Sequence, residues 1–240
     1  MRRIQNNAGF SLLELMIVLV ILLTITGAIF QLINLATERS NTEQTKVDMF
    51  QEAREFMDQM SRDMRAAGYP SPRNLDPSVL TQDPILNDLH GAAGLVKVDT
   101  GDLWFEGDVD GSGSVSVVQY HLDTSTTGNC PCLRRSQLPK QNGDPLTGQL
   151  TPVYQVEVQG VLNTNVFSAY TNGSALGLPV TTAALSGTAI AQVDTIQAQL
   201  TLQGANVDPQ TRQKPVTTLV STVKLNNCNQ AAIGYKTSCQ

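Results

Sequence analysis

An uninterrupted apolar segment near the start of the chain limits what this sequence can fold into. From Leu15 to Thr37 there are 23 residues without a charge, and most of them are Leu, Ile, Val, Met or Ala. At about 1.5 Å rise per residue, a helix of this length spans the roughly 30 Å of a bilayer's hydrocarbon core. One acidic residue, Glu14, stands at the head of the segment. Because a carboxylate costs up to about 3 kcal/mol near the middle of a bilayer, an ordinary anchor has no need of it.

Two ordinary interpretations of this segment leave something unexplained. A secretory signal peptide has a basic start, an apolar region of about 7–15 residues and a small-residue cleavage site. The chain begins with Arg2 and Arg3, but its apolar run is longer and no good Ala-x-Ala site follows. A plain N-terminal anchor fits the length but gives Glu14 no role.

The stretch Gly9-Phe10-Ser11-Leu12-Leu13-Glu14-Leu15-Met16 resembles the class III signal of type IV prepilins. The resemblance implies that prepilin peptidase cuts between Gly9 and Phe10 and that Phe10 becomes the N-methylated first residue. It also implies that Glu14 forms an assembly salt bridge with the α-amino group of a neighbouring subunit. Each of those two charges needs such a partner in a helix bundle of low dielectric constant.

The charge pattern bears on location and partners. The formal net charge is −5, and an acidic chain with scattered Lys and Arg lacks the basic stripe that nucleic acids demand, so no nucleic-acid partner is expected. Arg2 and Arg3 predict a cytoplasmic N-terminus and a single-pass protein of the inner membrane. The resemblance implies a pilus location after assembly. It implies as partners the inner membrane, the assembly platform, and other major and minor pilins bound through the N-terminal helix.

Helical character continues beyond the apolar segment. No proline occurs before Pro70, and residues 38–67 are rich in helix-forming residues. Gly68 and Pro70 predict the end of the helix. Apolar residues at helical spacing predict a face that packs on a globular domain: Val47, Phe50, Met57, Met60, Met64 and Ala67.

The end of this helix carries a second resemblance. The stretch Arg65-Ala66-Ala67-Gly68-Tyr69 is similar to the arginine-alanine-glycine-tyrosine pattern that closes the long helix of PilW-type minor pilins. The J-type pseudopilins of type II secretion end this helix in a related way. Together the two motifs cover the first seventy residues, with looser similarity beyond.

Residue periodicity changes to two in the second half of the chain. Alternation predicts strands at 102–106, 115–122, 155–161, 195–203 and 218–225, with a further strand starting at Cys132. Val156 and Val158 are expected on one face of their strand, whereas Ile196, Ala198, Leu200 and Leu202 are expected to face the core. One antiparallel sheet laid across the helix, an α+β fold with the helix as its spine, is the expected architecture, and the pilin resemblance implies the same.

These patterns divide the chain into five parts. Residues 1–9 are the expected leader, 10–37 the transmembrane half of the helix and 38–68 its amphipathic half. Residues 69–94 are expected to form a connecting loop in which His90 lies at the surface, and 95–240 a periplasmic or extracellular β domain.

One turn has the composition of a weak calcium site. Asp108, Asp110 and Ser112 offer oxygen ligands at alternate positions. However, glycine stands at the fourth position of this loop rather than the sixth, and Gln119 takes the place of a bidentate glutamate. Asp-Gly between two alternating segments is also a strong hairpin signal. The sequence therefore favours a turn, and no metal or cofactor is expected.

Four cysteines are compatible with disulfides outside the cytoplasm. Cys228 and Cys239 would close a short loop worth on the order of 3 kcal/mol, and the pilin resemblance favours this pairing because pilins often fasten their C-terminal loop in this way. Cys130 and Cys132 fit no recognised zinc spacing. A local bridge between them and pairing with the C-terminal cysteines both stay open, since four cysteines allow three connectivities.

Catalytic signatures are absent from the sequence. It contains no HExxH, no GxSxG elbow and no phosphate-binding glycine loop, so an enzyme is not expected. By family resemblance, the chain is expected to be a minor type IV pilin acting in pilus initiation or at the tip. The alternatives are a type II secretion pseudopilin, a tip module for adhesion or DNA uptake, and a membrane-anchored hydrolase.

Overall fold

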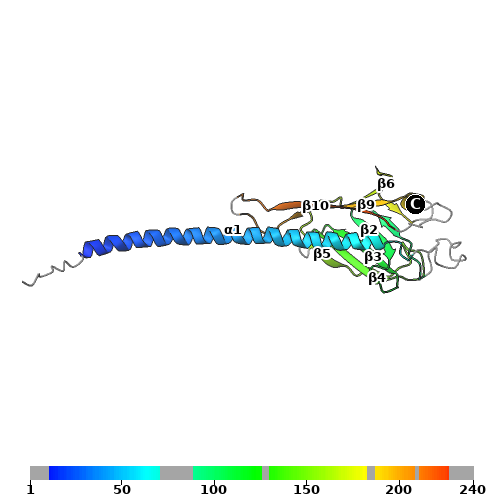
Figure 1. The fold of residues 1–240 in the computed structure, drawn as a ribbon, viewed down its shortest axis with the longest axis horizontal. Coiled ribbons are helices and arrows are strands. Elements are labelled where there is room, and N and C mark those ends of the chain that lie inside the picture. Colours follow the sequence, from blue (N-terminus) through cyan, green and yellow to red (C-terminus); the bar gives the residue numbers. More distant parts are fainter. Residues whose placement is uncertain (1–10, 71–88, 126–129, 183–186, 209–210, 227–240) are drawn as a thin grey trace, which may run out of the picture.

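The computed structural model describes residues 11–70, 89–125, 130–182, 187–208 and 211–226. One helix, α1 (Leu12–Ala66), extends far beyond a β domain that packs around its second half (Figure 1). The predicted α+β class is confirmed: a long N-terminal apolar helix packs against antiparallel sheets in a pilin-like arrangement. The other elements are β1 (Leu95–Val98), β2 (Asp102–Gly107), β3 (Ser116–Asp123), β4 (Cys132–Pro139), β5 (Gln155–Gln159), β6 (Phe167–Thr171), β7 (Ser174–Ala175), β8 (Val180–Thr181), α2 (Gly187–Ala191), β9 (Thr195–Gln203) and β10 (Val216–Lys224).

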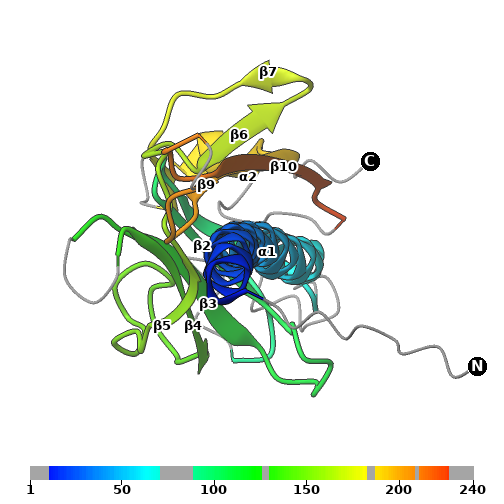
Figure 2. The same ribbon diagram turned by 90° about the vertical axis from the view of Figure 1, so that its left-hand side faces the viewer.

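The prediction of a single sheet is wrong, because the described strands form two sheets. The first has the order β5-β4-β3-β2-β1-β8, and the second has the order β10-β9-β6-β7. Helix α1 lies between them, in contact with β10 of one sheet and with β5 and β2 of the other (Figure 2). Period-two alternation shows which residues of a strand share a face, but it does not show which sheet the strand joins.

The longest strands agree best with the sequence pattern. Strand β9 has the predicted bounds, and its four core residues are buried as expected: Ile196, Ala198, Leu200 and Leu202. Strands β2, β3, β4 and β5 lie within a residue or two of their predicted positions, and β10 begins two residues earlier than predicted. The pattern missed β1, β6, β7, β8 and α2, which are all five residues long or shorter.

A bulge in β5 overturns the prediction that two valines share one face. Leu133 pairs with Val158, whereas the next residue of β4, Arg134, pairs with Val156. One step along β4 therefore corresponds to two steps along β5, and the extra residue rotates the strand. Val158 is buried while Val156 is exposed.

The predicted apolar stripe of α1 is only partly right. Met57, Met60 and Met64 are buried, and so is Ala67 just past the helix end, but Val47 and Phe50 are 52% and 45% exposed. The core cluster on α1 begins instead at Ala53 and takes in Phe56, whose ring meets that of Tyr120 edge-on at 5.7 Å. Helical spacing cannot reveal where along a helix the covering domain begins.

The end of α1 is fixed by close backbone contact with β2. Gly68 has φ +78°, a conformation that favours glycine, and its N–H donates to the carbonyl of Glu106 at 2.8 Å. A Cβ at Gly107 would lie 2.4 Å from the carbonyl oxygen of Ala66, so only glycine allows this approach. The helix therefore ends at Ala66, close to the predicted stop.

A fully buried ion pair fixes the segment that leads into β1 against the first sheet. Lys140 Nζ lies 2.9 Å from Glu106 Oε2, and both side chains are 0% exposed. Lys140 also donates to the carbonyl of Gly91, and Glu106 accepts from the N–H of Ala93. Burial raises the pKa of the Glu106 carboxyl, while Lys140 acts to lower it. Each charge depends on the other, because an unpaired charge at this depth is costly.

Replacing Lys140 by Met should lower the free energy of unfolding of the full-length protein in detergent by about 3–5 kcal/mol, because it strands a buried carboxylate. The loss should be smaller at pH 5 than at pH 8, since protonation of Glu106 removes the charge. Chemical denaturation followed by circular dichroism measures both effects. The control is Lys97→Met at the partly exposed pair with Asp102, whose charged atoms lie 2.8 Å apart, where a loss of about 0–1 kcal/mol is expected. Equal losses in the two variants would contradict this account.

Candidate functional site on the N-terminal helix

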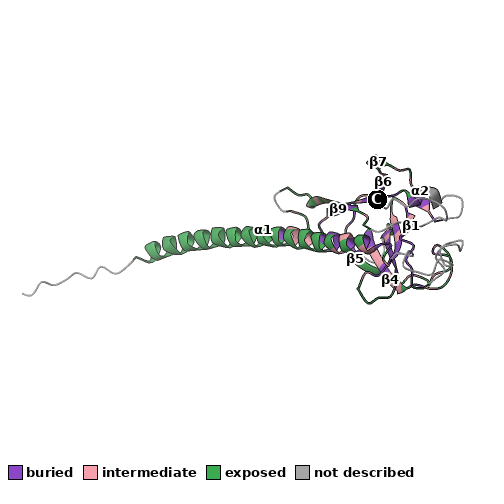
Figure 3. Ribbon diagram, turned by 45° about the vertical axis from the view of Figure 1, so that its right-hand side comes forward, coloured by how far each residue is buried: buried purple, intermediate pink, exposed green. Residues whose placement is uncertain are grey.

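The first half of α1 exposes an apolar surface. Every Leu, Ile, Val, Met and Phe side chain from Leu12 to Leu35 is between 49% and 79% exposed (Figure 3). Among the residues that the structure describes, α1 is the one helix long and apolar enough to cross a membrane. Water does not stabilise such a surface, so a bilayer or the apolar faces of other helices must cover it.

Glu14 lies in the first turn of this exposed half. The chain enters α1 through Ser11, which is extended, and the N–H of Leu15 donates to the carbonyl of Ser11 at 3.1 Å. An acidic side chain in the first turn is favoured by the partial positive charge of the helix N-terminus. The next charged residue along the helix is Glu38, so Glu14 is the one carboxylate on a long apolar surface.

Four predicted site residues lie outside the described part of the chain. Gly9 and Phe10, at the expected cleavage site, precede it, while Cys228 and Cys239 follow it. Their roles stay predictions.

A buried polar cluster fixes the second half of α1 against the first sheet. Asp63 of α1 accepts a hydrogen bond of 2.7 Å from the Tyr120 hydroxyl of β3 and forms an ion pair of 2.8 Å with Arg135 of β4. Burial and the nearby Asp63 raise the pKa of Tyr120 well above its ordinary value. The hydroxyl therefore stays protonated and donates to Asp63. Residues 57 and 72 positions apart meet here, and no sequence spacing points to them.

The second sheet contacts the same helix through β10 and the loop that precedes it. The hydroxyl groups of Ser61 and Ser221 lie 2.9 Å apart across the α1–β10 boundary. Nearer the exposed apolar half of α1, the loop between β9 and β10 reaches the helix, where Asn206 donates to Thr45 at 3.4 Å and Asp208 lies 3.5 Å from Lys46. The β9–β10 loop thus reaches α1 at Thr45 and Lys46, the apolar core on α1 begins at Ala53, and the exposed apolar half of the helix extends beyond the β domain.

The turn predicted at Asp108, Asp110 and Ser112 is held by hydrogen bonds among its own residues. Asp108 accepts hydrogen bonds from the N–H groups of Ser112 and Gly113, and Asp110 accepts a second one from Ser112. Hydrogen bonds from Ser112 lower the pKa of Asp110. The two carboxylates therefore organise the loop between β2 and β3, and Gly111 and Gly113 supply the positive φ angles that it requires.

The sequence left the partners of Cys130 and Cys132 open. In the structure these two cysteines form a local disulfide with each other at the start of β4. The carboxylate of Asp123 lies within 4.8 Å of both sulfur atoms. Sulfur atoms in a disulfide are not thiolate ligands, so this group holds no metal in the oxidised protein.

The histidines do not suggest catalysis. His90 is exposed, as expected. His121 Nδ1 lies 2.7 Å from Asp102, which also pairs with Lys97. Burial opposes the charge on Asp102, but the bonds from Lys97 and His121 hold the pKa of this carboxyl below its ordinary value. The three residues come from three neighbouring strands, and Lys97 and His121 both contact the one carboxylate of Asp102.

Comparison with known protein families finds a match at the start of the chain. Residues 4–30 match the prokaryotic N-terminal methylation motif. No curated protein and no solved structure matches the chain. The matched residues include Gly9, Phe10 and Glu14, together with most of the exposed apolar surface of α1.

Asp63→Ala should lower the free energy of unfolding of the full-length protein by about 3–5 kcal/mol, because Arg135 loses its buried partner. Tyr120→Phe removes two hydrogen bonds, the one donated to Asp63 and the one accepted from Arg135, and leaves the ion pair in place, so a loss of about 1–3 kcal/mol is expected at about 0.5–1.5 kcal/mol for each bond. Denaturant titration in detergent measures both values. A larger loss for Tyr120→Phe than for Asp63→Ala would show that the ion pair does not fix the helix.

Proposed function

We propose that this chain, a type IV pilin-like protein with the prokaryotic N-terminal methylation motif, is a minor pilin that enters a filament through α1. The motif implies processing by prepilin peptidase and assembly of the pilus type. The observation that carries the proposal is the division of α1 into an exposed apolar half and a half clamped between two sheets.

Each half of the helix has its own part in this mechanism. The apolar half keeps the subunit in the inner membrane before assembly, with the β domain outside. Transfer from the bilayer to a bundle of similar helices exchanges one apolar environment for another, so the apolar surface is never left in water. The second half of α1 is held between the two sheets, so the β domain moves together with the helix.

Glu14 gives the transfer its specificity. A lone carboxylate in an apolar bundle is stabilised by an opposite charge, and the amino group created by cleavage before Phe10 supplies one on a neighbouring subunit. The pairing favours one axial offset between neighbouring helices, because only that offset brings the two charges together. A low-copy role in initiation or at the tip follows from the resemblance of the helix end to PilW-type proteins.

A type II secretion pseudopilin is the second candidate. The stretch from Arg65 to Tyr69 is similar to the helix end of J-type pseudopilins as well, and the same helix would serve a secretion filament. The filament that takes up the tagged protein in its own cells distinguishes the two.

Glu14→Ala should be processed and inserted normally but should be incorporated into filaments about tenfold less, because the neighbour's amino group loses its partner. The ratio of protein in sheared filaments to protein in membranes measures this. Glu38→Ala is the matched control, since Glu38 is an exposed glutamate on the same helix beyond the apolar segment. Incorporation of Glu14→Ala at the level of this control would rule out the pairing role.

A bulky residue at the cleavage site should block processing. Gly9→Val is expected to leave the leader attached, so intact mass spectrometry should find a chain longer by nine residues and without an N-methyl group. Gly27→Ala serves as the control, because a Cβ at Gly27 meets no atom within 4 Å and the variant should be cut normally. A processed Gly9→Val chain would place the cleavage elsewhere.

A further inference from the structure

The two sheets have four edge strands, and three of them are poor templates for pairing. Strands β7 and β8 have two residues each, and β5 has five residues with a bulge. Strand β10 is different, because it has nine residues in unbroken register with β9. Short length, bulges, proline and charge are the usual protections of an edge. Strand β10 contains no proline, and its one charge is Lys224 at the far end.

Two hydrogen bonds show which backbone groups of β10 face away from β9. At one end Gly204 N–H donates to the carbonyl of Pro215, and at the other Leu225 N–H donates to Asp194, both at 2.8 Å. Bonded and non-bonded pairs alternate in an antiparallel ladder, so the odd-numbered residues bond β9. The N–H and C=O groups of the even-numbered residues therefore point to the open edge: Val216, Thr218, Val220, Thr222 and Lys224.

The residues at this edge are exposed and mostly uncharged. All five even-numbered residues are exposed, and Val216 and Val220 are 54% and 56% exposed. Among the residues that the structure describes, none forms a backbone hydrogen bond with these five outside the β9–β10 ladder. Valine and threonine suit a strand, so the edge has both the backbone groups and the side chains for one more strand.

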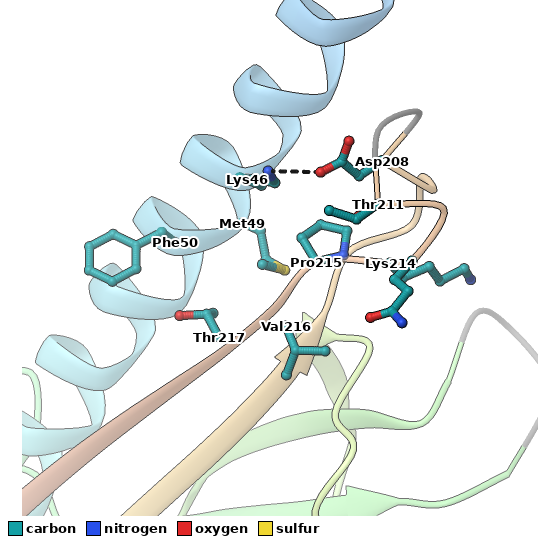
Figure 4. Close-up of a pocket in the computed structure, with 10 residues that line it drawn as sticks. Lys46, Met49, Phe50, Asp208, Thr211, Lys214, Pro215, Val216 and Thr217 are labelled. Atoms are coloured by element: carbon teal, nitrogen blue, oxygen red, sulfur yellow. Dashed lines mark ion pairs between the residues drawn. The ribbon is translucent and has the colours of Figure 1, made fainter.

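A groove borders the edge where β10 begins. Its volume is about 540 Å³, and it lies between α1 and the start of β10, with Met49 and Phe50 on one side and Pro215, Val216 and Thr217 on the other (Figure 4). The Lys46–Asp208 ion pair spans its end. Because half-exposed Phe50 belongs to α1, the groove continues the exposed surface of the helix onto the edge of β10.

We propose that the open edge of β10 binds an extended segment of another filament subunit as an added β-strand. The inference rests on the proposed function. Because Val216, Thr218, Val220 and Thr222 leave most of the edge uncharged, it favours an uncharged segment rich in Thr, Leu and Gln, like β9, which pairs with the opposite side of β10. Strand β10 runs alongside α1 (Figure 1), so the added strand would run along the filament and could join subunits that follow one another.

The direction of the membrane anchors excludes an antiparallel two-fold pair of β10 strands. A two-fold axis between antiparallel β10 edges would also reverse one α1 relative to the other, whereas copies anchored in one membrane have parallel helices. An open-ended filament requires a contact between two different surfaces, and a strand from another part of a neighbouring subunit provides one.

Val220→Pro tests the edge because it removes an N–H that points outward and leaves the ladder to β9 intact. In the cells that make the filament, this variant should be processed normally but incorporated about tenfold less than wild type. Val220→Thr keeps the N–H and the β-branched shape, and should be incorporated normally. Normal incorporation of Val220→Pro would overturn this inference alone. Absence of the wild-type protein from filaments would overturn the proposed function and this inference with it.

A cross-link identifies the occupant even where Val220→Pro fails to fold. A benzoylphenylalanine at position 222 of the full-length chain, activated by light in intact filaments, should join to an extended segment of another subunit. Mass spectrometry of the digested product locates the partner residue. Cross-links confined to lipid, to another subunit's N-terminal helix or to residues 227–240 of the same chain would overturn the proposal.

Discussion

The exposed apolar half of α1 is the constraint on which the rest of the structure depends. Each Leu or Ile side chain that passes from water to an apolar environment contributes about 1.5–3 kcal/mol, and this half of the helix is made almost entirely of such residues. The protein therefore always has a bilayer or other helices around it. Within this surface Glu14 is the exception, and its cost is offset only where an opposite charge meets it.

The β domain holds the second half of α1 in a fixed position between its two sheets. Two sheets pack on different sides of α1, and the polar contacts of Asp63 and Ser61 set its rotation and height against them. At the helix end, the approach of Gly107 to Ala66 and the hydrogen bond from Gly68 N–H to the carbonyl of Glu106 join the helix to the first sheet. A displacement of the apolar half is thus transmitted to the whole domain, as expected of a subunit whose assembly is driven through its helix.

Sequence reasoning recovers the parts of this fold that are long and periodic. The helix, its stop near Gly68, and strand β9 follow from local patterns, and the candidate site at Glu14 follows from its place in an apolar run. The second sheet, the bulge in β5 and the exposure of Val47 and Phe50 depend on how distant segments meet. The same holds for Asp63, Tyr120 and Arg135, which act together only after folding. The open edge of β10 becomes visible only when its neighbours are known.

The most direct test of the central claim is the intact mass and N-terminal sequence of the wild-type protein extracted from its own membranes. The predicted mature chain begins at an N-methylated Phe10 and retains the entire apolar segment, with Glu14 as its fifth residue. A chain that still begins at Met1, or one that has lost the apolar segment, would contradict the assignment of α1 as an assembly helix.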